Sequence, residues 1–116
     1  MVVDDHPKFL EAFEFMLMDS FPDQIDLIEF ANNGEECLKK LKGKFFDIVF
    51  MDIDMPVMNG ISATQKINEL YREVKVIALS MHSDMRYMIK MIEAGAKNYL
   101  VKEDINKENL EIAMNM

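Results

Sequence analysis

Cysteine is almost missing from this chain of 116 residues, in which Cys37 is the single example. One thiol excludes a disulfide within the chain. The sequence also lacks an apolar run near the roughly 20 residues that a membrane-spanning helix requires, and it has no signal-like start, linker, repeat or low-complexity tract. With 50% hydrophobic residues, these absences predict one compact cytoplasmic domain with a real core and no membrane partner.

Positive charge is scarce too, because 13 lysines and arginines stand against 21 aspartates and glutamates. The net charge of −8 and the isoelectric point near 4.7 mean that nucleic-acid phosphates and anionic lipids would repel the chain. The composition therefore argues against direct binding of nucleic acid and favours binding of a cation.

Short runs of β-forming residues alternate with segments of helical period. We expect strands at residues 1–3, 25–31, 47–51, 75–79 and 98–101, and helices at residues 8–20, 35–42, 61–71, 84–94 and 107–115. Strands such as IVFM and VIAL are nearly continuous apolar runs, which is typical of a parallel sheet covered on both faces. Five βα units with right-handed crossovers predict a doubly wound α/β domain.

Ligands of such a sheet collect at the carboxyl ends of its strands. The residues that follow the predicted strands there are Asp4, Asp5 and His6, then Asp52 and Asp54, then Ser80, Met81 and His82, and finally Lys102. Asp52 directly follows the apolar run VFM. A carboxylate at the end of a buried strand calls for a function. Asp4, Asp5 and Asp52, together with a hydroxyl and an amine at the same edge, predict a reactive site.

This set of side chains suits phosphoryl transfer to a carboxylate. Asp4, Asp5 and Asp52 would repel one another unless a hard divalent cation lay among them, and Mg²⁺ accepts a few carboxylates while keeping waters. Asp52 could then attack a phosphoryl group to give an aspartyl phosphate. The Lys102 ammonium would neutralise charge on the phosphoryl oxygens, and Ser80 could donate a hydrogen bond to them. A rigid strand end would hold Asp52 in register with the metal.

The two histidines are expected to face solvent or to contact the metal ligands without binding the ion, since Mg²⁺ prefers oxygen. His6 and His82 therefore receive no catalytic role.

Four motifs occur in a specific order and spacing: VVDDHP, MDIDMPVMNG, ALSMHSD and GAKNYLVK. Together they resemble the receiver domains of bacterial two-component response regulators over essentially the whole chain. The resemblance implies a flavodoxin-like sheet of five parallel strands in the order 2-1-3-4-5 with five helices. It also implies these roles: Asp52 as phosphoacceptor, Asp5, Asp52 and the main-chain carbonyl of Asp54 as Mg²⁺ ligands supported by Asp4, Lys102 as the catalytic lysine, and Ser80 and Tyr99 as the switch.

Finer features are similar to receivers of the NarL/FixJ type, namely DDHP, LSMH and the pair Lys102-Glu103 where many receivers have Lys-Pro. That resemblance implies a sensor histidine kinase as partner, phosphorylation-dependent dimerisation, and control of transcription through a helix-turn-helix domain that this chain lacks. Residues 1–116 are thus expected to be a receiver excised from a longer chain. The stretch MDIDMPVMNGISAT also resembles receivers fused to hybrid histidine kinases, and a single-domain relay stays open.

A rival from another class is a hydrolase, because Asp52-Ile53-Asp54 resembles the Asp-x-Asp of haloacid-dehalogenase-type phosphatases. That family places its acidic metal pair downstream of the motif, whereas here the acid pair comes first. A flavin binder or purely structural module of the same architecture lacks the expected Gly-rich phosphate loop. The sequence favours a non-enzymatic phosphoacceptor.

Two predicted helices are apolar on more than one side. Residues 84–94 are rich in methionine, and residues 8–20 carry several phenylalanines. Core packing explains part of this pattern, and an exposed partner surface is the alternative for each. By resemblance to receiver domains, the helix at residues 8–20 would dock the histidine kinase.

Overall fold

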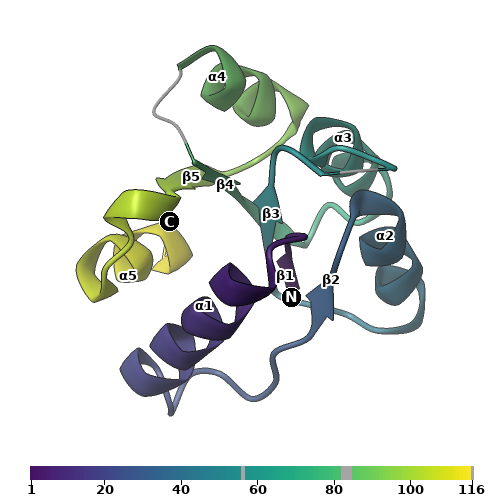
Figure 1. Ribbon diagram of the computed structural model, residues 1–116. Coiled ribbons are helices and arrows are strands. Elements are labelled where there is room, and N and C mark those ends of the chain that lie inside the picture. Colours follow the sequence, from purple (N-terminus) through teal and green to yellow (C-terminus); the bar gives the residue numbers. More distant parts are fainter. Residues whose placement is uncertain (56, 82–84, 116) are drawn as a thin grey trace.

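The computed structural model describes residues 1–55, 57–81 and 85–115. Strands and helices alternate along the chain as β1 (Val2–Val3), α1 (Pro7–Ser20), β2 (Phe30–Ala31), α2 (Gly34–Gly43), β3 (Ile48–Asp52), α3 (Gly60–Leu70), β4 (Lys75–Ser80), α4 (Met85–Ala94), β5 (Asn98–Val101) and α5 (Lys107–Asn115), as Figure 1 shows. A 3₁₀ turn, Lys102–Asp104, directly follows β5. Among the described residues, no helix is both long and apolar enough to cross a membrane.

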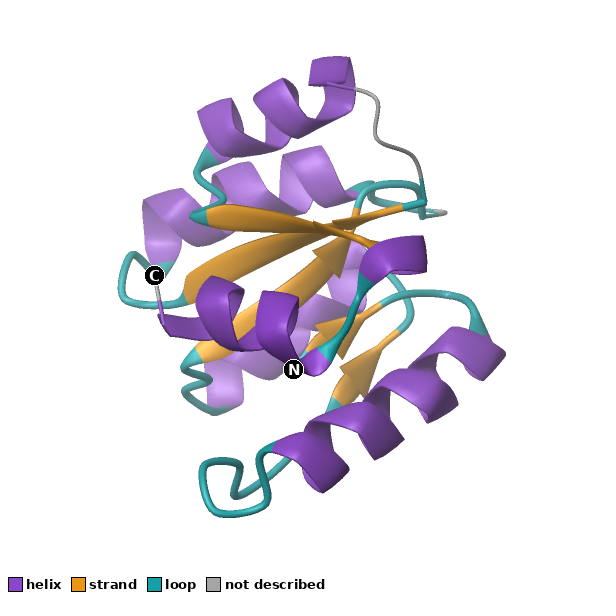
Figure 2. Cartoon of the chain, turned by 90° about the vertical axis from the view of Figure 1, so that its left-hand side faces the viewer, coloured by secondary structure: helices purple, strands orange, loops and turns teal. Residues whose placement is uncertain are grey.

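The five strands form one parallel sheet in the order β2-β1-β3-β4-β5, which confirms the predicted topology. Its longest ladder joins β3 to β4, where Ile48 lies opposite Lys75 and Asp52 lies opposite Leu79. Helices cover both faces of this sheet, α2, α3 and α4 on one side and α1 and α5 on the other (Figures 1 and 2). The result is the doubly wound α/β architecture.

Each face of the sheet has its own core because successive residues of a strand point to opposite sides. Val49 and Met51 of β3 pack with α2, α3 and α4. Phe50, between them, packs with α1 and α5, and its ring meets that of Phe13 edge-on at 5.0 Å. A fully apolar strand is therefore required at β3, as the run IVFM predicted.

The predicted strand at residues 25–31 is wrong over most of its length, because β2 contains only Phe30 and Ala31. Pairing with β1 sets this limit, since Val2 lies opposite Phe30 and Val3 opposite Ala31. Residues 25–29 are apolar enough for a strand, but among the described residues the one backbone hydrogen bond between them and β1 runs from the Val2 N–H to the Glu29 carbonyl at 2.9 Å. Ile25 and Ile28 instead pack half-buried against the core on the α1 side.

The other boundaries differ from the predicted ones by at most one residue. Two of these differences affect the site, because Asp52 and Ser80 are the last residues of β3 and β4 and do not merely follow them. The predicted helix at residues 84–94 is described from Met85 onward, and Asp84 lies outside the described residues.

The two helices that are apolar on more than one side, α1 and α4, expose part of their apolar surface. In α1, Phe13 and Leu17 are buried, whereas Phe15 is 72% exposed. In α4, Met88 and Met91 are buried, whereas Met85 and Ile89 are exposed. Core packing therefore explains only one side of each helix, and the remaining apolar surface is exposed to solvent.

Candidate functional site

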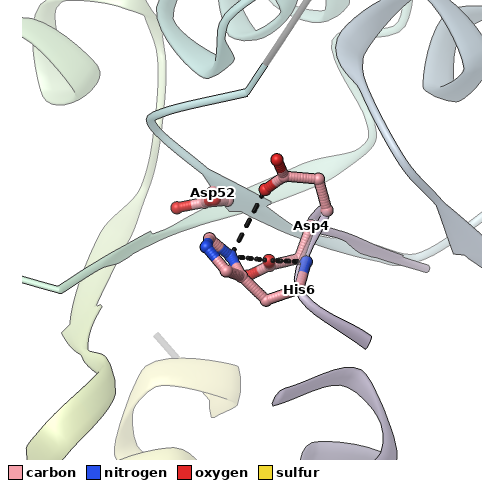
Figure 3. A group of neighbouring side chains, drawn as sticks. Asp4, His6 and Asp52 are labelled. Carbon is pink, nitrogen blue, oxygen red and sulfur yellow. Dashed lines mark hydrogen bonds and ion pairs between the residues drawn. The ribbon is translucent and has the colours of Figure 1, made fainter. Parts of the chain in front are cut away.

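The predicted site residues meet at the carboxyl edge of the sheet. Asp4 directly follows β1, and its backbone N–H donates to the Ala31 carbonyl at 3.0 Å, which continues the β1–β2 ladder. Asp52 ends β3 in the centre of the sheet, and Lys102 begins the turn after β5. Neighbouring parallel strands end side by side, so three segments far apart in the sequence place these side chains together (Figure 3 shows Asp4 and Asp52).

The acidic residues form a tight cluster. Asp4, Asp5, His6 and Asp52 each offer one ligand atom, and all of these atoms lie within 4.8 Å of one another. Asp4 is 0% exposed and Asp52 is 3% exposed, whereas the Asp5 side chain keeps about a third of its surface open to solvent. Buried carboxylates this close together repel one another and require positive charge nearby.

Lys102 supplies one such charge. Its ammonium nitrogen lies 2.6 Å from Asp4 Oδ2 and 3.6 Å from Asp52 Oδ1, and its side chain is almost fully buried. The same nitrogen lies 4.5 Å from the centre of the Phe9 ring, a cation–π contact. Sequence reasoning did not assign Phe9 to the site, because its apolar side chain reads only as part of the packing face of α1.

His6 contacts the cluster from its solvent side. Its Nδ1 lies 2.8 Å from Asp4 Oδ1 and 3.3 Å from Asp5 Oδ1, and its backbone N–H also donates to Asp4 Oδ1 at 2.9 Å. The hydrogen bond to Asp4 raises the pKa of the imidazole above its usual value. His82, the other histidine considered from the sequence, lies outside the described residues.

The negative charge of Asp52 is only partly compensated by its surroundings. Burial, together with the neighbouring Asp4 carboxylate, raises its pKa from 3.8 to about 6 even though Lys102 acts in the opposite direction. Its Oδ2 atom is buried and has no hydrogen-bond partner among the described residues. A buried carboxylate oxygen without a donor is unfavourable. The donor set, all hard oxygens except for one imidazole, fits a divalent cation at this oxygen.

A pocket of about 180 Å³ opens beside Asp52. Its described lining consists of His6, Asp52, Ile53, Asp54, Ser80, Met81 and Tyr87. Asp54 and Ser80 thus lie next to Asp52 as predicted, while Tyr87 of α4 was not assigned to the site. A larger pocket of about 610 Å³ lies between the ends of α2 and α3, but its described lining contains none of the clustered acids, so we place the chemistry at the smaller one.

Tyr99 stands apart from the acid cluster. It lies on β5 opposite Ala78 and is 40% exposed, and it lines a separate groove beside α5. Ser80, one strand away, is buried and lies opposite Val101. The two proposed switch residues are therefore on adjacent strands but line different pockets.

Gly60 fixes the loop that follows Asp52. Its N–H donates to the Ile53 carbonyl at 2.9 Å, and a Cβ placed on it would lie 2.0 Å from the Asp52 carbonyl oxygen. Only glycine allows this approach of two backbones. In the same loop Val57 adopts a positive φ of 70°, an unfavourable conformation for a β-branched residue.

Comparison with known proteins agrees with this arrangement. The model of the response regulator receiver domain matches residues 1–115. The transcriptional regulatory protein DegU of Brevibacillus brevis is 32% identical over 103 residues, which cover 89% of this chain and 43% of DegU. The chain spans less than half the length of the curated relatives that it matches.

Solved structures show the same fold. The signal receiver domain of the putative response regulator NarL from Mycobacterium tuberculosis superposes with a TM-score of 0.84 at 24% identity, covering 99% of this chain and 94% of that one. The receiver domain of the sensor histidine kinase PA1611 from Pseudomonas aeruginosa, whose structure holds a magnesium ion in its active-site cleft, gives 0.84 at 23% identity, with 98% and 91% covered. By its sequence match and its strand order, this chain belongs to the response regulator receiver domain family.

Proposed function

We propose that this receiver domain accepts a phosphoryl group on Asp52 and transmits the modification as a change of conformation. The observation that carries the proposal is the state of Asp52, a nearly buried strand-end carboxylate with a raised pKa, one oxygen that lacks a partner among the described residues, and a lysine ammonium 3.6 Å from the other oxygen. A rigid nucleophile beside a fixed cation is the arrangement that phosphoryl transfer requires.

Mg²⁺ is the cofactor that the cluster suits best. The ion would be held by Asp5, Asp52 and the main-chain carbonyl of Asp54, with Asp4 supporting its position, and when bound it would neutralise charge on the phosphoryl group. Support comes from ligand atoms gathered within 4.8 Å and from the Asp52 oxygen that has no described donor. The PA1611 receiver, of the same fold, holds magnesium in its cleft.

The protein residues would act as follows. An Asp52 carboxylate oxygen forms a bond to phosphorus while the bond from phosphorus to the imidazole nitrogen of the donor phosphohistidine breaks, and the donor histidine leaves. Lys102, held by Asp4 and by the Phe9 ring, stays within reach of the new equatorial oxygens. The Ser80 hydroxyl, in the same pocket, donates a hydrogen bond to one of them. Transfer to Asp52 and later hydrolysis would both be self-catalysed and slow, so we propose that the domain acts as a signalling element and not as an enzyme that turns over a substrate.

The partners follow from this role. The donor is a sensor histidine kinase in the cytoplasm, and residues 1–116 form the receiver unit of a longer regulator. DegU, which shares this domain, is a transcriptional regulatory protein. We therefore assign transcription control through a DNA-binding domain outside this chain, aided by phosphorylation-dependent homodimerisation. Receivers of hybrid kinases and single-domain relays use the same chemistry and are distinguished by the sequence of the full gene.

Incubation with acetyl phosphate and Mg²⁺, followed by intact-protein mass spectrometry, tests the proposal. The parent should gain one phosphoryl group, stable in acid and labile in base, and Asp52→Asn should gain none. Asp54→Asn is the matched control and should still be labelled, because only its main-chain carbonyl is proposed to act. Labelling that persists in Asp52→Asn would remove Asp52 from its role. Turnover of p-nitrophenyl phosphate that depends on both acids would instead identify a hydrolase.

A further inference from the structure

An imidazole nitrogen lies among the carboxylates of the proposed magnesium site. His6 Nδ1 is 2.8 Å from Asp4 Oδ1 and 3.3 Å from Asp5 Oδ1, and the ring faces the same pocket as Asp52 (Figure 3). Oxygen ligands alone satisfy Mg²⁺, so the proposed function gives this nitrogen no task. Its position raises the question of which ions the site selects.

The spacing of these atoms matches that of ligands around one ion. Metal–ligand bonds of about 2.0 to 2.2 Å place adjacent ligand atoms roughly 3 Å apart and opposite ones roughly 4 Å apart. The separation of 3.3 Å between His6 Nδ1 and Asp5 Oδ1 is that of adjacent ligands. The full set of Asp4, Asp5, His6 and Asp52 atoms lies within 4.8 Å, so side-chain rotations that release the His6 ring from its hydrogen bond to Asp4 would bring an imidazole and two carboxylates to a shared ion.

The charges in the cluster indicate which acids remain for that ion. Asp4 Oδ1 accepts from His6, and Asp4 Oδ2, which has no hydrogen-bond partner among the described residues, is paired with the Lys102 ammonium at 2.6 Å. Asp52 Oδ2 is also buried without a hydrogen-bond partner among the described residues, although Asp52 is 3% exposed. This oxygen is a second, independent indication of a bound cation, separate from the grouping of acids.

We propose that His6 makes this site selective for divalent transition ions that favour imidazole, of the Co²⁺ and Zn²⁺ class, which bind through Asp5, Asp52 and His6 in competition with Mg²⁺. Imidazole is a good ligand for these ions and a poor one for Mg²⁺, and their affinities for mixed nitrogen and oxygen sites are higher. The inference deepens the proposed function and rests on its metal site, but it does not depend on phosphorylation. Such ions would then set how much of the receiver is available in its magnesium form.

Calorimetric titration with Co²⁺ and with Mg²⁺ tests the selectivity, using protein without a polyhistidine tag, since a tag would bind Co²⁺ itself. The parent should bind Co²⁺ at least about tenfold more tightly than Mg²⁺, and His6→Gln should weaken Co²⁺ binding by about tenfold. Mg²⁺ affinity in His6→Gln should change by less than about threefold, because oxygen ligands hold that ion. Retained Mg²⁺ binding also shows that the variant is folded.

NMR of the Co²⁺-bound protein identifies the ligand directly. A coordinated imidazole gives a strongly shifted ring N–H signal, which should vanish in His6→Gln. The chain has two histidines, so His82→Gln is the matched control and should keep the signal. Loss of the signal in His82→Gln instead, or equal weakening of Co²⁺ and Mg²⁺ in His6→Gln, would overturn the inference, and the second result would mean that His6 only positions Asp4.

The two proposals fail in different ways. A parent that binds Co²⁺ through His6 but takes no phosphoryl group from acetyl phosphate in Mg²⁺ would keep the inference and defeat the proposed function. A parent that is phosphorylated in Mg²⁺ but shows no Co²⁺ preference and no shifted imidazole signal would do the reverse. Absence of binding for both ions would overturn the inference and the assigned cofactor together.

Discussion

Lys102 is paired more closely with Asp4 than with the proposed phosphoacceptor. Its ammonium nitrogen lies 2.6 Å from Asp4 Oδ2 and 3.6 Å from Asp52 Oδ1. Because the Lys102 side chain is 4% exposed and Asp4 is 0% exposed, the pair is shielded from solvent. The lysine is thus paired first with Asp4. Burial and then the Asp4 carboxylate raise the pKa of Asp52, and the more distant lysine only partly offsets them.

Replacing Lys102 by methionine should therefore affect stability and metal binding in opposite directions. Removing one partner of a buried pair leaves Asp4 uncompensated, so the free energy of unfolding at pH 7.5 without metal should fall by about 3 kcal/mol. Mg²⁺ affinity should stay similar or rise, because a neighbouring cation is gone. Urea denaturation and calorimetry measure the two effects. Lys97→Met, at an exposed lysine, should change stability by less than about 0.5 kcal/mol. Asp5→Ala removes a proposed ligand and should weaken Mg²⁺ binding, and an equal drop in Mg²⁺ affinity in Lys102→Met would contradict these roles.

Asp52→Asn should stabilise the metal-free protein at neutral pH. Its carboxyl has a pKa of about 6 in the folded chain, above the value of 3.8 that applies without burial, so the native state binds more protons between these values. The contribution of this carboxyl group to the free energy of unfolding is therefore greatest below pH 4, and that contribution is lost as the pH rises through 6. Asparagine removes the ionised form, so we expect a gain on the order of 1 to 3 kcal/mol at pH 7.5.

The pH dependence of this gain is its critical test. At pH 5 the difference in unfolding free energy between Asp52→Asn and the parent should be about half of that at pH 7.5. Saturating Mg²⁺ should reduce the gain at pH 7.5, because the ion stabilises the carboxylate of the parent. Urea melts in EDTA and in Mg²⁺ supply both comparisons. A gain that is equal at the two pH values would show that the uncompensated charge of Asp52 is not its cause.

Gly60→Ala should displace the strand end that carries Asp52. The added Cβ would lie 2.0 Å from the Asp52 carbonyl oxygen, and backbone atoms cannot move aside as a flexible side chain can. We expect a loss of about 2 kcal/mol or more in unfolding free energy, together with slower labelling by acetyl phosphate. Gly43→Ala is the matched control, since nothing lies within 4 Å of a Cβ there, and it should leave both properties nearly unchanged. Equal melting curves for the two variants would contradict the constraint.

The alternation of strands and helices and the acidic part of the site could be predicted because they depend on local signals, whereas the strand order came from the resemblance to receiver domains. Apolar runs that end on Asp4 and Asp52, placed at the same edge of a parallel sheet, were enough to predict their proximity. The length of β2 could not be predicted, since it depends on how many residues of β1 are available to pair. The contact of Lys102 with Phe9 could not be predicted either, because it joins the first helix to the end of the last strand.

The last prediction concerns how a phosphoryl group on Asp52 is detected elsewhere. Ser80 is buried in the pocket beside Asp52, whereas Tyr99 lies on the next strand and is 40% exposed. The Tyr99 ring therefore still has surface to bury, and we expect it to turn inward when the Ser80 hydroxyl moves toward the new charge. Beryllofluoride, which mimics the phosphoryl group, should shift the Tyr99 ring signals in NMR spectra of the parent, with Tyr71 at the opposite edge of the sheet as internal reference. Ser80→Ala should still bind the mimic at Asp52 but should lose most of the Tyr99 shift, because a ligand moves an equilibrium only through its differential affinity for the two states. The same Tyr99 shift in Ser80→Ala as in the parent would mean that the signal leaves Asp52 by another path.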